Sequence, residues 1–119
     1  MIKQIDFDPA AREELRKARV WHEQQQAGLG LEFAADFDRS IAEVLQSPER
    51  FPRYLSGTQR CLLHRFKYLI VFLFENDCLA IVAVSHGSRR PGYWRKRLNK
   101  FDLNINPPAV PGITNGVLR

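Results

Sequence analysis

Residues 85–97 combine one histidine, five cations, a tyrosine and a tryptophan, directly after an apolar run at residues 79–84. Cationic groups held beside aromatic rings are the side chains that grip phosphates and unstacked bases, or an acidic protein surface. A short apolar run of this kind is typical of a buried strand. The sequence therefore places these side chains at the end of a strand, where we predict a working surface.

The charge of the chain is divided unevenly. Residues 1–50 hold seven Lys/Arg against ten Asp/Glu, whereas residues 51–119 hold eleven against three. Residues 86–100 contain six cations, Lys100 included, and no acid. A concentrated positive field favours nucleic acid or an acidic protein segment as partner. A basic surface that serves only solubility is the alternative.

Length and composition indicate one globular domain, since the chain has 119 residues of which 45% are hydrophobic. No run approaches the roughly 18 apolar residues of a membrane span, and the start lacks the apolar region of a signal peptide. We therefore expect no membrane association and a cytoplasmic location. Cys61 and Cys78 have no CxxC or HxxxH spacing around them, so we expect neither a disulfide, a metal nor a cofactor.

Two helices are expected after a short strand over residues 2–7. Asp8 can cap a helix whose first turn begins at Pro9, and apolar residues then recur at helical spacing to a stop near residues 27–28. A second amphipathic helix runs from about Leu31 to Leu45 and ends at residues 47–48. The two should form an antiparallel hairpin.

Three strands follow, over residues 60–66, 68–75 and 78–85, with connections short enough for an antiparallel meander. We predict an α+β fold in which the N-terminal strand joins the same sheet and the hairpin covers one face. The domain should span residues 1–100, and residues 101–119, rich in Pro, Gly and Asn, should form a flexible tail. The predicted core is Leu15, Trp21, Phe33, Phe37, Ile41, Leu45, Leu63, Ile70, Phe72, Ile81 and Ala83.

The order of these elements coincides with specific fragments that resemble one family. They are EL at 14–15, ARVWHE at 18–23, GLEF at 30–33, SP at 47–48, FP at 51–52, RFKYLI at 65–70, AVSH at 83–86 and RRPGYW at 89–94. Over about residues 1–98 the chain is similar to the RelE/ParE superfamily of toxins from bacterial type II toxin–antitoxin modules, in the plasmid-stabilisation branch. The resemblance implies a growth-arresting toxin that a cognate antitoxin neutralises. The target that it implies is ribosome-bound mRNA if the chain acts as RelE-like members do, or DNA gyrase if it acts as ParE-like members do.

Metal-free RNA cleavage needs a proton acceptor, cations beside the phosphate and a proton donor. The catalytic candidates are His86, Arg89 and Tyr93, and those for binding the substrate or target are Arg65, Arg90, Trp94, Arg95 and Arg97. Structural roles compete with these: His86 could fix the turn after its strand, Arg65 could be a solvated or antitoxin-facing cation, and the two aromatic residues could cover the sheet edge.

Two positions depart from the ribonuclease pattern of the family. RelE-like ribonucleases carry arginines where this chain has Leu69-Ile70 and Gly87, and the basic cluster before the meander is reduced to Arg53 and Arg60. These differences favour a ParE-like action on gyrase or another replication component slightly over mRNA cleavage. A catalytically silent basic binding module is the third reading.

Overall fold

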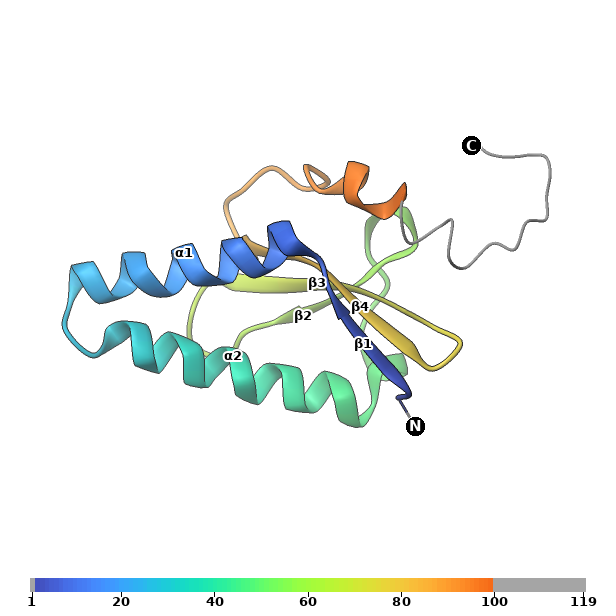
Figure 1. The fold of residues 1–119 in the computed structure, drawn as a ribbon, viewed down its shortest axis with the longest axis horizontal. Helices are drawn as coiled ribbons and strands as arrows, with labels where there is room; N and C mark the ends of the chain where they lie inside the picture. The colour runs from blue at the N-terminus through green and yellow to red at the C-terminus, as the bar shows by residue number, and fades with distance from the viewer. Residues whose placement is uncertain (1, 100–119) are drawn as a thin grey trace.

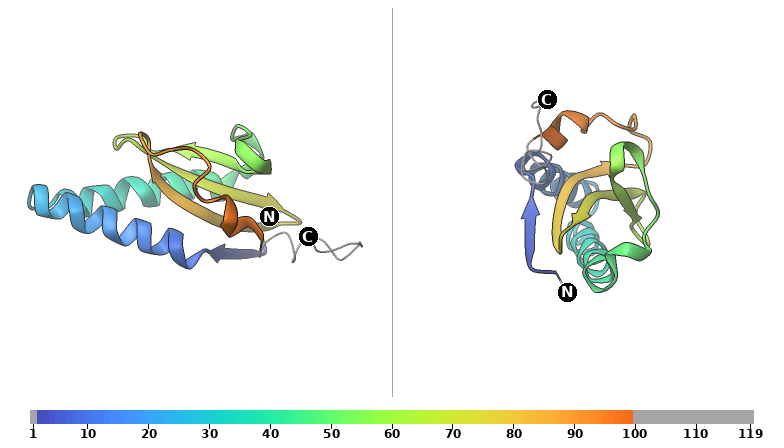
Figure 2. Two further views of the ribbon diagram at one scale, coloured as in Figure 1. Left: turned by 90° about the horizontal axis from the view of Figure 1, so that it is seen from above. Right: turned by 90° about the vertical axis from the view of Figure 1, so that its right-hand side faces the viewer.

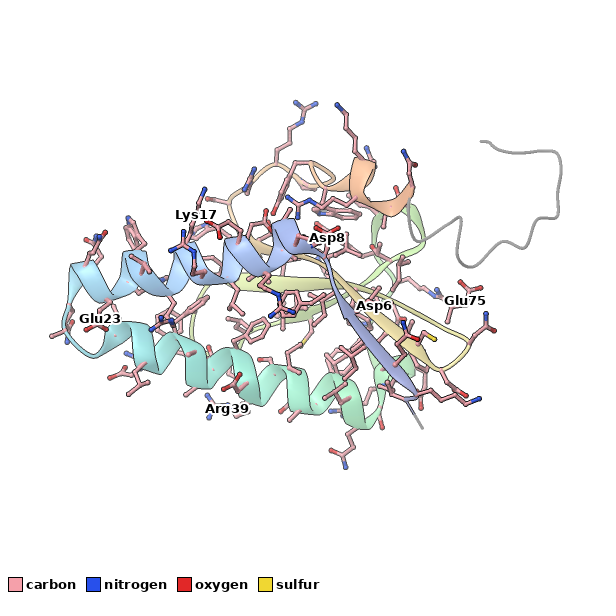
Figure 3. All side chains as sticks on the ribbon, in the orientation of Figure 1. Asp6, Asp8, Lys17, Glu23, Arg39 and Glu75 are labelled. Atoms are coloured by element: carbon pink, nitrogen blue, oxygen red, sulfur yellow. The ribbon has the colours of Figure 1, made fainter. Side chains whose placement is uncertain are left out.

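Helix α1 (Pro9–Gln25) begins as the sequence predicts. In this computed structural model, which describes residues 2–99, the Asp8 carboxylate accepts a hydrogen bond from the Ala10 N–H at 2.8 Å, and Pro9 occupies the first turn. Asp8 and Glu23 mark the two ends of the helix in Figure 3. The predicted flexible tail, residues 101–119, and the domain boundary at 100 lie outside the described residues.

Helix α2 (Leu29–Gln46) returns antiparallel to α1 and ends before Ser47 and Pro48, which confirms the predicted hairpin (Figure 1). The Glu23 carboxylate accepts the backbone N–H of Gly28 and of Gly30, so it closes the turn between the helices. A Cβ on Gly30 would lie 2.6 Å from the Arg19 carbonyl oxygen. Glycine at this position therefore lets the two helices approach closely.

The strands form one four-stranded sheet in the order β1-β4-β3-β2. The strands are β1 (Gln4–Phe7), β2 (Gln59–Leu62), β3 (Tyr68–Glu75) and β4 (Cys78–His86). The meander β2-β3-β4 is antiparallel, and β1 joins it by pairing in parallel with β4, as expected. Asn76 and Asp77 connect β3 and β4 with φ of +53° and +63°, the pattern of a type I′ hairpin turn.

Strand β2 is shorter than the predicted strand over residues 60–66. The carboxylate of Asp36, in α2, accepts the backbone N–H groups of His64, Arg65 and Phe66 at 3.2, 2.9 and 3.1 Å. These N–H groups point at one carboxylate instead of a neighbouring strand, so the chain leaves the sheet after Leu62.

Both faces of the sheet are buried. Alternate side chains of β3 separate the two cores: Ile70 and Phe72 face the helices, while Leu69 and Val71 face the other way. The second face is covered by Trp94 and Leu98 from the segment after β4, coloured orange where it runs back along the sheet in Figure 2. Among residues 2–99 no helix has the length and apolar character needed to cross a membrane.

The predicted core is confirmed with one error. Trp21 is 55% exposed, and its neighbour His22 is buried instead, with its ring stacked on Phe33 at 4.9 Å. One residue along a helix is a rotation of about 100°, so Ala11, Ala18 and His22 form the inward stripe and Trp21 lies beside it. Leu15, Ile41 and Leu45 are only partly buried, at the margin of the core.

Candidate functional site

The predicted site residues divide between two places, which we call the Glu14 junction and the β2–β3 pocket. At the Glu14 junction, the carboxylate of Glu14 in α1 accepts hydrogen bonds from the side chains of Tyr93 and Arg97 and from the Val84 N–H. The Tyr93 hydroxyl lies 2.6 Å from Glu14 Oε2, and two Arg97 nitrogens lie 3.0 Å from the two carboxylate oxygens. The Arg89 guanidinium lies 3.5 Å from Glu14 Oε2. One carboxylate therefore binds three of the predicted site residues.

Tyr93 is held as a neutral hydrogen-bond donor at this junction. Burial, together with its bond to Glu14, raises the pKa of Tyr93 to about 12. The Arg89 guanidinium lies over the ring, 3.6 Å from its centre. A phenol that already donates to a carboxylate and keeps its proton at neutral pH is poorly placed to exchange that proton with a substrate.

Arg97 closes the edge of the sheet as well as pairing with Glu14. It donates to the Val82 carbonyl oxygen at 3.0 Å, beside the Glu14 bond to the Val84 N–H. Burial alone would lower the pKa of Arg97, but the Glu14 carboxylate outweighs this and raises it. Strand β1 pairs with β4 only as far as Ile81. Beyond that residue, the side chains of Glu14 and Arg97 form hydrogen bonds with backbone groups of β4.

Trp94 does not present its ring at the surface. It is 1% exposed and packs in the second core near Tyr54, which is the covering role considered as the alternative to base stacking. Arg95 is exposed and donates to Ser56 Oγ at 3.0 Å. Arg90 is also exposed, and no side-chain ion pair of Arg90 occurs among residues 2–99.

The β2–β3 pocket is lined by residues 62–68 and 86–88 and has a volume of about 590 Å³. It brings His86 and Arg65 together, although His86 ends β4 and Arg65 lies in the connection between β2 and β3. His86 Nδ1 accepts the Ser88 N–H at 3.0 Å, which places the hydrogen of the neutral imidazole on Nε2. The His86 ring also meets the edge of Tyr68, with 5.1 Å between centres.

Arg65 is part of the pocket wall and pairs with Glu32 of α2, with its side chain 59% exposed. The Asp36 carboxylate, 1% exposed, holds the backbone of the same wall. Burial raises the pKa of Asp36, but the N–H bonds from Arg65, Phe66 and His64 and the Arg39 side chain together lower it below its ordinary value. The wall is therefore fixed by an ionised carboxylate.

The two positions without arginine lie where the fold leaves little room for a cation. Leu69 is buried in the second core, and its place in β3 pairs with Ser85. Gly87 donates its N–H to the Lys67 carbonyl oxygen at 2.7 Å, and a Cβ there would lie 3.3 Å from that oxygen. Apolar packing and a close backbone contact thus stand where RelE-like ribonucleases carry charge.

Sequence reasoning missed four residues that organise these sites. Lys67 and Tyr68 line the pocket, Asp36 holds its wall and Glu14 gathers Tyr93 and the arginines. Lys67 and Tyr68 stand beside Arg65 in a fragment already singled out, so that fragment could have pointed to them. Glu14 likewise stands in the EL fragment at 14–15, whereas Asp36 is an ordinary acid of an amphipathic helix that no local pattern distinguishes.

Comparison with known proteins identifies the family. The model of the ParE toxin of the type II toxin–antitoxin system parDE matches residues 5–91, and the chain belongs to this family. The structure is similar to that of a chromosomal ParDE toxin–antitoxin system from P. aeruginosa, with a TM-score of 0.60 and 16% identity over 72% of this chain and 96% of the other. This likeness supports the fold. The comparison with curated proteins gives no match.

Proposed function

We propose that this ParE-family toxin arrests growth in the cytoplasm by poisoning DNA gyrase or another replication component, and that a cognate antitoxin neutralises it. The observation that carries the choice of target is the Glu14 junction. Tyr93, Arg97 and Arg89 are groups that metal-free RNA cleavage could use, and each is already engaged by one carboxylate. The family match and the similar ParDE system support the toxin role and the antitoxin partner.

Ribosome-dependent mRNA cleavage is the second candidate, because His86 Nε2 and Lys67 line an open pocket. In that case His86 would be the leading group for proton transfer. A silent basic binding module, which keeps the fold and the antitoxin contact without a target, would be recognised by the lack of growth arrest.

Growth arrest followed by inspection of DNA and mRNA separates these functions. Induction of the chain alone should stop growth, and co-expression with the neighbouring small reading frame should restore it. Purified toxin should inhibit gyrase supercoiling or accumulate cleaved DNA while ribosome-bound mRNA stays intact. Cuts at fixed codon positions with unaffected gyrase would replace the gyrase proposal by mRNA cleavage, and normal growth under verified soluble expression would leave the silent module.

The exposed cations after β4 can be tested as the target contact. A variant with His86, Arg89 and Arg90 all changed to Ala should remain folded and lose toxicity. The matched control changes Arg16, Lys17 and Arg19 of α1 to Ala, because these three are also exposed cations. Equal toxicity of the two variants would rule out the segment after β4 as the contact surface.

A further inference from the structure

We propose that the face of the sheet opposite the helices binds the phosphate backbone of duplex DNA through Arg60, Arg95 and Lys96. We call these three residues, with the loop at 54–56, the Arg60 surface. It lies on the other side of the sheet from the β2–β3 pocket, and it includes none of the residues changed to test the target contact. The proposal goes beyond the gyrase proposal, because it concerns this chain and DNA alone.

Strand β2 directs the side chain of Arg60 away from the helices. Side chains alternate along a strand, and Cys61 packs in the core beneath the helices, so Arg60 and Leu62 face the opposite side of the sheet. The Arg60 guanidinium lies over the ring of Tyr54, 5.1 Å from its centre, and Tyr54 packs against the second core. Arg60 is therefore held by a ring that belongs to this face.

A second guanidinium reaches the same loop from the segment after β4. Arg95 Nε donates to Ser56 Oγ at 3.0 Å, two residues after Tyr54. Trp94, which precedes Arg95, packs near Tyr54 with 6.1 Å between ring centres. Lys96 follows as an exposed cation of the same short turn. Two guanidinium groups from distant parts of the chain thus meet at one loop, and Lys96 is the chain neighbour of one of them.

No carboxylate neutralises these cations. Residues 51–74 and 78–99 contain no Asp or Glu. Arginines elsewhere, such as Arg16 and Arg65, pair with carboxylates, whereas Arg60, Arg95 and Lys96 form no ion pair among residues 2–99. Unpaired charges of one sign on one face favour a partner that carries several negative charges.

Both guanidinium groups keep hydrogen-bond donors for such a partner. Arg95 uses Nε for Ser56, which leaves its two terminal nitrogens, and the Arg60 side chain forms no hydrogen bond among residues 2–99. A guanidinium can donate two parallel hydrogen bonds to the oxygens of one phosphate. Because Arg60 and Arg95 are already held against Tyr54 and Ser56, they lose less side-chain freedom on binding.

The Arg60 surface suits a duplex better than a single strand. Proteins bind single strands by stacking the bases on open aromatic rings. Here Trp94 is 1% exposed, and Arg60 covers the ring of Tyr54. A duplex needs no such ring, since its bases stay stacked and its phosphates face outward.

The Arg60 surface also suits a duplex better than an acidic protein. Protein interfaces combine an apolar centre with a polar rim. In the described part of the chain, Leu62, 61% exposed, is the large apolar side chain that this face leaves to solvent. One such residue does not form an apolar centre, so the contacts that this face offers are those that phosphates use.

The test measures binding of the purified full chain to a fluorescein-labelled DNA duplex of mixed sequence, by anisotropy at several salt concentrations. We expect a Kd of about 10⁻⁶–10⁻⁴ M at physiological salt. The logarithm of the binding constant should fall linearly with the logarithm of the salt concentration, by about 0.9 for each phosphate contact. Addition of the duplex should shift the amide resonances of residues 54–60 and 94–97.

Variants show whether the named cations make these contacts. Changing Arg60, Arg95 and Lys96 together to Gln should make the salt slope shallower by about 2.7, because three contacts are lost. Lys96→Gln alone should make it shallower by about 0.9. Since Lys96 is exposed, this single variant keeps the test decisive if the triple variant does not fold.

The matched control changes Arg16, Lys17 and Arg19 to Gln, which removes the same number of cations from the exposed side of α1, where Figure 3 labels Lys17. It should keep the salt slope of the wild type. If the two triple variants flatten the slope equally, net charge alone explains the binding and the proposal is overturned.

Three further results would overturn the proposal. They are no binding at millimolar concentration, amide shifts confined to residues 62–68 and 86–88, and tighter binding of polyglutamate or of a single strand than of the duplex. Since gyrase is absent from these measurements, their failure and the failure of the gyrase proposal are independent.

Discussion

The Tyr93 hydroxyl lies 2.6 Å from Glu14 Oε2, although 79 positions separate the two residues in the chain. This bond joins the segment after β4 to the first helix, and the same carboxylate binds Arg97 and the Val84 N–H. Some of the residues that the sequence predicts to form a functional surface are thus engaged in contacts that stabilise the fold.

Glu14→Ala should lower the free energy of unfolding by about 3 kcal/mol, because it leaves Tyr93, Arg97 and the Val84 N–H without their acceptor in a largely buried place. Urea unfolding measures the change. Glu13→Ala is the matched control, since Glu13 pairs with Arg16 on the exposed side of the same helix and should unfold as the wild type does. Equal effects at the two positions would mean that the junction contributes no stability.

Asp36→Asn should destabilise the protein at neutral pH and matter less in acid. Because the pKa of Asp36 is lowered in the folded state, its ionised form contributes stability above the ordinary value of 3.8, and this is lost as pH falls through the folded pKa. Urea unfolding of both proteins at pH 7, 5 and 3 should show a difference of about 3 kcal/mol at pH 7 and 5 that narrows at pH 3. A difference independent of pH would contradict an ionised Asp36.

Phe37→Ala should cost about 3–5 kcal/mol in the free energy of unfolding, as large aromatic truncations in cores do. Phe37 is 5% exposed and stacks on Phe7 of β1, with 6.3 Å between ring centres. Leu31→Ala, in the same helix but 73% exposed, should change stability little. An unchanged unfolding midpoint for Phe37→Ala would show that the register of α2 is wrong.

Tyrosine ionisation offers a direct test of the Glu14 junction. In a titration followed at 295 nm, the signal that Tyr93→Phe removes should appear only at about pH 12, where the pKa of Tyr93 lies. Glu14→Gln should move this signal to lower pH, because the negative partner is gone. Near-ultraviolet circular dichroism at each pH shows whether the fold persists, and appearance of the Tyr93 signal near pH 10 in a folded protein would refute the assigned bond.

The elements of this fold could be predicted because each is encoded locally. Asp8 and Pro9 start α1, Ser47 and Pro48 stop α2, and two residues with left-handed backbone form the turn at Asn76. Trp21 was misplaced because neighbouring apolar and aromatic residues differ by only one step around a helix. Local encoding therefore fixes the type and order of elements better than the face that a side chain occupies.

The candidate site could be predicted only in part. His86 and Arg65 do meet at one pocket, but the roles of Tyr93 and Arg97 depend on an acid 79 and 83 positions away. Likewise, Asp36 ends β2 from 28 to 30 positions away. Such contacts depend on how the helices pack on the sheet, so the spacing of residues within a helix does not predict them.

The edge of β4 beyond Ile81 bears on how copies of the chain behave toward one another. Unpaired strand edges are templates on which a second molecule can add a strand, the usual start of aggregation. Here the Glu14 carboxylate accepts a hydrogen bond from the Val84 N–H, and Arg97 donates one to the Val82 carbonyl oxygen. Two backbone groups of that edge are therefore already bonded to side chains. Loss of Glu14 would uncover a stretch of apolar strand, and the variant would then associate with itself in proportion to its concentration.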